Sequence, residues 1–427
     1  MIDLKRLRQD PDASRASLLR RCDASVGPLL DALLDLDRQR RELLVAVETQ
    51  KAERNAASEE VARRKRGGEP ADDLMAGLKA SGEEVKALDA RLREIEAALH
   101  QRALALPNFP AAEAPDGDAS ANRVVRTWGM PPTFDFTPRP HWDLGAALGI
   151  LDLPAGAKIT GSGFPVFRGM GARLLRALSN FMLDLHTREH GYQEVAPPYL
   201  VNRASVTGTG QLPKFEDDLY VVPSDDLFLI PTAEVPVTNL HRDEILEAAD
   251  LPRGYCAWTP CFRREAGAHG KDTRGLIRVH QFDKVELVRF VRPEDSDAEH
   301  ARLTGHAEAV LQRLGIPYRV VELAAGDTGF ASAHTFDLEV WAAGVGAWLE
   351  ASSSSTFTDF QARRANIRFR PAPKAKPEFV HTLNASGVAF PRTIIALLEN
   401  NQAADGSVRV PEALVPYLGV DRLLPGA

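Results

Sequence analysis

Arginine and glutamate side chains recur at alternate positions in two nearby segments of the chain. The first segment, YCAWTPCFRREAG, places Arg263 and Glu265 two residues apart. Alternate residues of a strand point to the same face, so this spacing predicts one shared surface. The second segment, LIRVHQFDKVELVRF, predicts a returning strand that carries on one face Arg278, His280, Phe282, Lys284 and Glu286. Such a face could bind anions and a planar ring, or form ordinary cross-strand ion pairs in solvent.

The elements that must position these residues follow from their neighbours in the sequence. A polar, glycine-containing loop, AHGKDTRG, joins the two segments, which predicts an antiparallel hairpin. Upstream, Gly171 to His190 has helical apolar spacing and leads into the strand-like YQEVAPPYLV. The pair Gly270 and Lys271 does not complete a Walker A loop, and no dinucleotide fingerprint is present. Nucleotide binding would therefore depend on arginines of an antiparallel sheet.

The first hundred residues show a different periodicity. Positions spaced alternately four and three apart are mostly apolar, the pattern of a coiled-coil seam. In the first arm they are Leu29, Leu33, Leu36, Arg40, Leu43, Val47, Gln50, Arg54, Ala57 and Val61. In the second arm they are Leu74, Leu78, Ser81, Val85, Leu88, Leu92, Ile95 and Leu99. The glycines and proline of RRKRGGEPADD break the helix between them, so the arms form an antiparallel hairpin over about 29–104.

The hairpin carries a basic cluster where its two arms meet. Arg63, Arg64, Lys65 and Arg66 are consecutive. More than thirty helical residues per arm give a rod on the order of 50 Å long. Its end could contact phosphates without disturbing a core, or be a solvated turn. A Pro-, Ala- and Asp-rich stretch over 106–140 predicts a linker, so we expect domains at 1–105 and 141–427.

Composition limits the class of protein. The 427 residues are 44% hydrophobic and 26% charged, enough apolar material for more than one core. The net charge of −7 argues against bulk nucleic-acid binding and requires any RNA contact to be local. Three cysteines are too few for a disulfide framework, and no secretory or membrane-spanning stretch is apparent. We expect a cytoplasmic protein without membrane contact, with Cys256 and Cys261 structural and not half of a zinc site.

Three ordered blocks give the chain a family resemblance. FRREAGAHGKDTRGLIRVHQFDKVEL and TLNASGVAFPRTIIALLENNQ resemble motifs 2 and 3 of class II aminoacyl-tRNA synthetases, and PTAEVPVTNL resembles the serine-binding loop of seryl-tRNA synthetases. The helix and strand that end at Pro197 and Pro198 resemble motif 1, the dimer element. The opening MIDLKRLRQDPD and the hairpin resemble the tRNA-binding arm. The resemblance implies an α+β fold in which an antiparallel coiled-coil hairpin precedes a catalytic domain with a helix-flanked antiparallel sheet.

The resemblance also implies an activity and its participants. It implies ATP-dependent activation of L-serine to seryl-adenylate and transfer of serine to tRNA(Ser) by a homodimer that uses Mg²⁺. Arg263, Arg278 and Arg392 would be the catalytic cations, since planar multi-donor groups suit a carboxylate beside phosphates. The hairpin would bind tRNA through Arg63, Arg64, Lys65 and Arg66. Whether tRNA(Sec) is charged as well is left open by the resemblance.

The residues implied for each substrate are as follows. ATP would contact Arg263, Arg264, Glu265, Arg278, Val279, Phe282, Glu350, Ala351, Ser352, Ser353 and Arg392. Mg²⁺, which prefers hard oxygen ligands, would be held by Glu350 and Ser353. Serine would contact Thr232, Ala233, Glu234, Arg263, Glu286, Asn384 and Ser386. Without the resemblance, Glu350 would be an ordinary carboxylate at a strand end.

The sequence departs from the family pattern at a few positions. Pro391 stands where glycine usually precedes the motif 3 arginine, and Phe390 replaces a smaller residue. Ala268 and His269 occur in the motif 2 loop, where Ser and Ala are common. Two alternative functions remain: a paralogue that passes seryl-adenylate to an acceptor other than tRNA, and a dimeric scaffold without catalysis. The basic hairpin argues against the first, and the retained arginines and glutamates argue against the second.

Overall fold

The computed structural model describes residues 1–266 and 274–426. Contacts divide the chain into two compact units, one formed by Ile2–Leu19 with Asp23–Pro107, the other by Met1, Arg20–Cys22 and Asn108–Ala427. Within the part of the chain that is described, no helix has the length and apolar character needed to span a bilayer.

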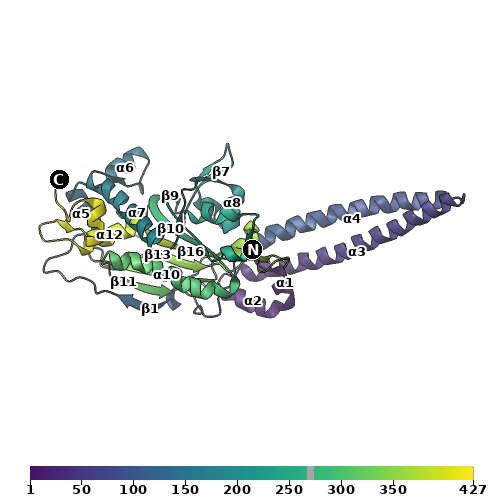
Figure 1. Cartoon of the computed structure of the whole chain (residues 1–427), viewed down its shortest axis with the longest axis horizontal. Helices are drawn as coiled ribbons and strands as arrows, with labels where there is room; N and C mark the ends of the chain where they lie inside the picture. Colours follow the sequence, from purple (N-terminus) through teal and green to yellow (C-terminus); the bar gives the residue numbers. More distant parts are fainter. Residues whose placement is uncertain (267–273, 427) are drawn as a thin grey trace. The chain divides into compact units, whose positions relative to one another are not determined.

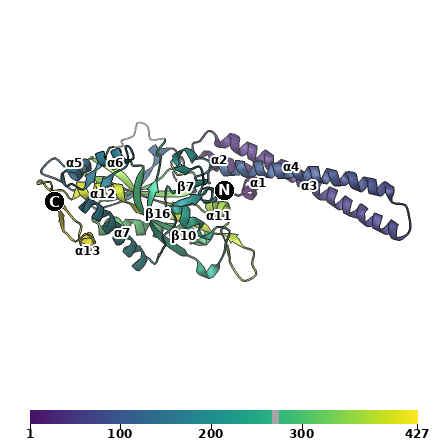
Figure 2. The same ribbon diagram turned by 90° about the horizontal axis from the view of Figure 1, so that it is seen from above.

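The N-terminal unit consists of helices. Its elements are α1 (Leu4–Gln9), α2 (Pro11–Leu19), α3 (Val26–Arg66) and α4 (Asp72–Ala105). The helices α3 and α4 run side by side as the predicted antiparallel hairpin (Figures 1 and 2). Ion pairs Lys51–Asp89 at 3.0 Å and Arg64–Asp73 at 3.5 Å cross between the arms and define their register.

The predicted seam is confirmed along α4 and in part of α3. Every predicted α4 position is buried or half-buried, and Leu33, Val47 and Val61 are buried in α3. Close to α2 the buried residues of α3 also include Leu30 and Asp37, which are not seam positions, because α3 is covered there by more than one helix. More residues of α3 are therefore buried near the base of the hairpin than a two-helix seam alone would bury.

The C-terminal unit is built on an eight-stranded sheet. Its strands, in spatial order, are β1 (Arg123–Trp128), β11 (Tyr318–Glu322), β12 (His334–Ala342), β13 (Ala347–Thr356), β16 (His381–Ala389), β10 (Gln281–Val291), β9 (Arg253–Phe262) and β4 (Gln193–Glu194). All neighbours pair antiparallel except β4 with β9. The predicted hairpin is β9–β10, and the expected α+β class is confirmed.

Helices cover one face of this sheet and leave the other for a pocket. The helices α7 (Met170–Arg188), α10 (Ser296–Arg313) and α12 (Phe390–Asn400) contribute to one apolar core with Val285 and Leu287 of β10. The intervening residues Lys284 and Glu286 face the opposite side. Strand alternation thus separates a core face from a polar face, as the sequence predicted.

Shorter elements complete the unit. The helices are α5 (His141–Ala147), α6 (Leu153–Ile159), α8 (Arg203–Thr209), α9 (Glu234–Thr238), α11 (Phe360–Ala365) and α13 (Val415–Leu418). The strands are β2 (Leu151–Asp152), β3 (Val166–Phe167), β5 (Leu200–Asn202), β6 (Val221–Val222), β7 (Leu227–Leu229), β8 (Ile245–Glu247), β14 (Arg368–Arg370), β15 (Glu378–Phe379), β17 (Val408–Arg409) and β18 (Arg422–Leu423). Short 3₁₀ turns connect several of them.

The predicted linker over 106–140 is wrong in part. This stretch contains β1, which pairs with β11 and forms one edge of the main sheet. All six β1 residues are exposed, and Pro and Gly flank the strand. An edge strand whose side chains are all exposed has no buried face, so its sequence need not alternate between apolar and polar residues.

Candidate active site

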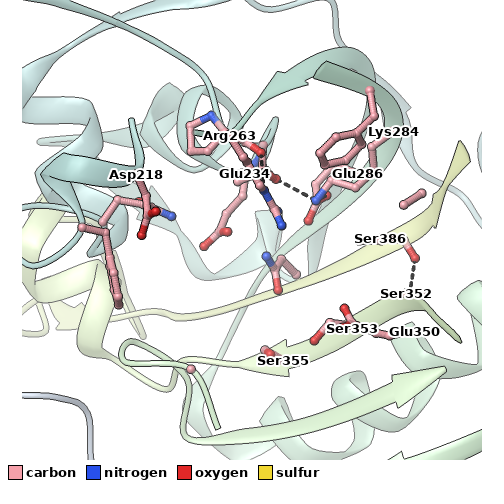
Figure 3. Close-up of a pocket in the computed structure, with 18 of the residues that line it drawn as sticks. Asp218, Glu234, Arg263, Lys284, Glu286, Glu350, Ser352, Ser353, Ser355 and Ser386 are labelled. Carbon is pink, nitrogen blue, oxygen red and sulfur yellow. Dashed lines mark hydrogen bonds and ion pairs between the residues drawn. The ribbon is translucent and has the colours of Figure 1, made fainter. Parts of the chain in front are cut away.

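A cavity of about 660 Å³ opens on the polar face of the sheet. Its walls come from β10, β13 and β16, the segments flanking the β9–β10 loop, and the start of α12. Figure 3 shows Lys284 and Glu286 opposite the serines of β13, with Arg263 and Glu234 between them and Asp218. The cavity brings together most of the residues singled out from the sequence: Thr232, Glu234, Arg263, Glu265, Arg278, Val279, Phe282, Glu286, Glu350, Ala351, Ser352, Ser353, Asn384, Ser386 and Arg392.

Two expected site residues lie outside this lining. Ala233 precedes α9 and is fully buried in a separate apolar cluster with Val237 and Phe290. Arg264 is exposed, and its backbone N–H donates to the Asp218 carbonyl at 3.0 Å. Each is adjacent in sequence to residues that do line the cavity, Ala233 at the start of α9 and Arg264 just beyond the end of β9. The structure therefore does not place these two side chains in the cavity lining.

The ends of the hairpin strands differ from the prediction. Strand β9 ends at Phe262 and β10 begins at Gln281, so Arg263, Glu265, Arg278 and His280 lie outside regular strand. Glu265 has a φ of 52°, which ends the alternation. His280 does not line the cavity, because its backbone N–H donates to Gly163 at 2.8 Å and its ring lies beside Phe164.

Three arginines line the cavity, Arg278 and Arg392 at one end and Arg263 between that end and the buried carboxylates. The Arg263 Nε donates to the Pro231 carbonyl at 3.2 Å, and its guanidinium lies 5.3 Å from the centroid of the Phe282 ring. Arg278 forms an ion pair with Glu265. Arg392 donates to the Glu350 carbonyl at 2.6 Å and lies 3.5 Å from its carboxylate. This end therefore combines fixed cations with an aromatic ring, which suits a nucleotide.

Two buried carboxylates lie at the other end. Glu234 is 7% exposed and Glu286 is 1% exposed. Burial, and then the neighbouring Glu286 charge, raise the pKa of Glu234 to about 7. Burial raises the pKa of Glu286, against the opposing effect of the Lys284 ammonium. Gln361 of α11 donates to Glu234 Oε1 at 2.6 Å and fixes its position. Carboxylates removed from water in this way suit a small cationic, hydroxylated ligand.

Some cavity residues had no role assigned from the sequence. Lys284 is 5% exposed and lies 2.5 Å from Glu286 Oε2. Its position two residues before Glu286 placed it on the correct face, so strand alternation could have revealed its role. Asp218, Phe215 and Phe330 also line the cavity. They come from irregular segments distant in sequence, where no periodicity or motif could have indicated them.

Oxygen groups suitable for a hard cation lie on β12 and β13. Glu350 and Ser353 both line the cavity, with the Glu350 side chain 48% exposed. Asp337 of β12 pairs with Ser353 across the ladder, and its buried Oδ1 has no hydrogen-bond partner among the described residues. Burial, followed by the Glu350 charge, raises the pKa of Asp337 well above its usual value. An unpartnered carboxylate oxygen beside two hard donors fits Mg²⁺.

The unusual motif 3 residues are accommodated at a helix start. Phe390 and Pro391 are the first two residues of α12, where proline is tolerated because the early N–H groups have no helical partner. Phe390 is buried, and Pro391 lines the cavity beside Arg392. The other departures, Ala268 and His269, lie outside the described residues.

The end of the helical hairpin is less basic than its four consecutive cations suggest. Glu60 forms ion pairs with Arg63 at 2.7 Å and Arg64 at 3.1 Å. Lys65 and Arg66 are exposed and have no carboxylate partner in the part of the chain described. Glu60 precedes these two partners by three and four residues in the sequence, and the helix brings side chains at that spacing together.

Burial also explains the two cysteines of β9. Cys256 and Cys261 are both fully buried. Burial raises the pKa of the Cys256 thiol to about 12 and also raises that of Cys261. These thiols are therefore packing groups of the sheet at neutral pH.

Comparison with known proteins adds independent information. Residues 1–110 match the family model of the seryl-tRNA synthetase N-terminal domain, and residues 214–401 match the class II tRNA synthetase core domain (G, H, P, S and T). The serine--tRNA ligase of Gemmatimonas aurantiaca is 59% identical over 98% of this chain and 99% of its own length. That of Carboxydothermus hydrogenoformans is 55% identical over 99% of both chains.

Solved structures agree with these matches. The seryl-tRNA synthetase from Pyrococcus horikoshii complexed with ATP superposes with a TM-score of 0.96 at 37% identity, with complete coverage of both chains. The cytoplasmic serine-tRNA ligase from Naegleria fowleri in complex with AMP gives a TM-score of 0.87 at 29% identity over 98% of this chain and 97% of its own.

Proposed function

The chain belongs to the seryl-tRNA synthetase family, and we propose that it activates L-serine with ATP and transfers serine to the 3′ end of tRNA(Ser). The observation that carries this proposal is the cavity itself. One end presents Arg278, Arg392 and an aromatic ring, the other presents two buried carboxylates, and Arg263 lies between them. A nucleotide triphosphate and a small amino acid would meet between them.

The arginines supply the chemistry of activation. The serine carboxylate attacks the α-phosphorus of ATP, an acyl-phosphate bond forms, and pyrophosphate leaves with the displaced electron pair. Arg263, between the two ends, would hold both reacting anions, and Arg278 and Arg392 would stabilise the phosphates. Phe282 would stack on the adenine, and Glu265 would accept from its amino group. Catalysis in this arrangement depends on positioning and charge, without a nucleophilic side chain.

Mg²⁺ would be held by Glu350 and Ser353. When bound with ATP, it would neutralise phosphate charge and orient the phosphates for in-line displacement. Asp337, directly across the ladder from Ser353, adds a half-buried carboxylate to the same region of the sheet.

The carboxylates select the amino acid. Glu234 would bind the serine ammonium group, assisted by Thr232, and Glu286 would accept from the serine hydroxyl near Ser386 and Asn384. A buried carboxylate whose hydroxyl partner is missing is costly, so alanine would be rejected. Threonine would be excluded by the shape of the pocket.

The remaining parts serve the tRNA and assembly. We propose that the hairpin binds tRNA through its basic end, and that α7 with β4 forms the interface of a homodimer. The reaction would take place in the cytoplasm, where tRNA is used in protein synthesis. Sedimentation at micromolar protein tests the dimer, and a fully active monomer would contradict it.

One experiment tests the activity in two stages. Serine-dependent exchange of pyrophosphate into ATP measures adenylate formation, and charging of total tRNA with labelled serine measures transfer. We expect both activities. Exchange without charging would instead support an acceptor other than tRNA, and the absence of exchange with a folded protein would support a scaffold.

A further inference from the structure

A buried lysine lies at the amino-acid end of the cavity, and the proposed reaction does not yet use it. Lys284 is 5% exposed, and Figure 3 shows it beside Glu286 on the same strand. Its Nζ lies 2.5 Å from Glu286 Oε2 and donates to Thr232 Oγ1 at 2.9 Å. An ammonium group removed from water in this way needs a function or a strong partner, because the loss of its hydration is costly.

The Thr232 hydroxyl is committed by its hydrogen bonds. Its oxygen accepts from Lys284 Nζ at 2.9 Å and from the Glu234 backbone N–H at 3.2 Å. A hydroxyl oxygen has two acceptor positions, so both are used and only its proton remains to donate. Glu286 is the carboxylate whose pKa this hydroxyl lowers. Thr232 and Lys284 therefore act together on Glu286.

This arrangement divides the two polar groups of the substrate between the two carboxylates. The ammonium of an amino acid can only donate, and the saturated Thr232 oxygen has no position left for it. Glu234, held by Gln361, remains as its acceptor. Lys284 Nζ contacts Oε2 of Glu286, whereas Oε1 has no hydrogen-bond partner among the described residues, so Oε1 keeps capacity to accept from a hydroxyl.

Other charges near Glu286 do not replace Lys284. Arg263 also acts on Glu286 electrostatically, but its guanidinium is held at the Pro231 carbonyl and over Phe282, toward the phosphate end. Glu234 carries the same sign as Glu286. Lys284 is therefore the cation in direct contact with the hydroxyl-sensing carboxylate within the described structure.

We propose that Lys284 is a specificity-determining positioning residue, which with Thr232 holds Glu286 as an oriented, ion-paired acceptor for the serine hydroxyl. The inference rests on the proposed function, because it explains how the same cavity distinguishes serine from alanine. It also revises the role of Thr232, from a ligand of the ammonium group to a support of the hydroxyl acceptor.

The test is the Lys284→Met variant, which keeps the stem of the side chain and removes its charge. Pyrophosphate exchange is measured with serine and with alanine as separate substrates. We expect kcat/KM for serine to fall by about 10- to 100-fold while that for alanine changes by less than about threefold, because only serine uses the hydroxyl acceptor. A Lys158→Met variant, at an exposed site of α6, is the matched control.

A double-mutant cycle with Glu286→Gln separates this role from a structural one. If Lys284 acts through Glu286, Lys284→Met should cost less than about threefold further in the Glu286→Gln background, since the interaction is already absent there. Thermal unfolding of each variant identifies general destabilisation. Equal losses for serine and alanine, or additive effects in the cycle, would overturn the proposal. A wild-type protein without serine-dependent exchange would instead reject the proposed function itself.

Discussion

Glutamates of the helical hairpin and of the cavity respond to their surroundings in opposite directions. Hydrogen bonds from Arg63 and Arg64 lower the pKa of Glu60, at the exposed end of the hairpin, to about 2. Burial raises the pKa of Glu234 to about 7. The same side chain is thus permanently charged in one region and titrates near neutrality in the other. The partners of Glu60 lie one helical turn away in the sequence, whereas the burial that raises the pKa of Glu234 is not visible in local sequence.

The two regions also use their cations differently. Arginines of the hairpin pair with carboxylates one helical turn away, which contributes little to stability because both groups stay solvated. Arginines of the cavity converge from segments far apart in the sequence on a shared space. Loss of a cavity cation should therefore affect chemistry strongly, whereas loss of a hairpin cation should affect only binding.

The largest expected effect follows from Arg263→Ala. We expect pyrophosphate exchange to fall by about 10³-fold or more, because the variant can no longer hold either reacting group. The fold should be retained, since this side chain lines a cavity and is not part of a core. Arg253→Ala, at the opposite end of β9, is the control. Near-normal exchange in the Arg263 variant would show that the reacting groups bind elsewhere.

A smaller effect is expected for Glu286→Gln. The amide keeps an acceptor oxygen but removes the charge, so discrimination between serine and alanine should narrow by about 10- to 100-fold. Steady-state exchange with both amino acids measures this ratio. Asp283→Asn, on the opposite face of the same strand, should leave the ratio unchanged. Unaltered kinetics for both substrates in Glu286→Gln would place the hydroxyl pocket at another site.

Serine affinity should depend on pH through Glu234. Because its pKa is raised to about 7, the carboxyl is protonated below that pH and loses its attraction for the ammonium group. We expect KM for serine to rise by about tenfold between pH 8 and pH 6. Glu234→Gln should remove this dependence and leave a uniformly high KM. An identical pH profile in the two proteins would assign the ammonium to a different acceptor.

The same group gives a stability prediction of defined sign. The native carboxyl binds a proton up to about pH 7, whereas the unfolded carboxyl releases it near its ordinary pKa of 4.5. The native state therefore holds more protons in this window, so the contribution of Glu234 to the free energy of unfolding decreases as pH rises through it. Urea unfolding of wild type and Glu234→Gln at pH 5 and pH 8 measures the difference.

The smallest effect is expected at the end of the hairpin. Replacing Arg63, Arg64, Lys65 and Arg66 together with alanine should spare pyrophosphate exchange and raise KM for tRNA several-fold. Each cation that no longer meets a phosphate should reduce the slope of log K against log salt by up to about one unit. Lys65 and Arg66 should contribute most, because Glu60 already pairs with the other two cations.

The Glu60→Gln variant should have the opposite effect on tRNA binding. It frees Arg63 and Arg64, so tRNA binding should become tighter at low salt. Normal charging by the fourfold alanine variant at physiological salt would mean that tRNA is bound along the flanks of the hairpin instead. Loss of pyrophosphate exchange would mean that the hairpin affects the catalytic unit.

The sequence by itself determined the periodic and motif-bearing parts of this protein. Heptad spacing defined α4 and much of α3, because a two-helix seam repeats locally along the chain. Alternation placed Phe282, Lys284 and Glu286 on one face of β10, because a strand reverses side-chain direction at every residue. Family resemblance then connected the arginine and glutamate positions to an activity.

Only the tertiary structure decided which of these residues meet and in what charge state. It removed Ala233 and Arg264 from the cavity, added Asp218 and Phe330, and made part of the expected linker an edge strand. It also joined Lys284 to Thr232, 52 residues away, and buried both beside Glu286. Long-range packing sets burial and hence desolvation, so the pairing and the pKa values of the cavity carboxylates depend on the folded chain as a whole.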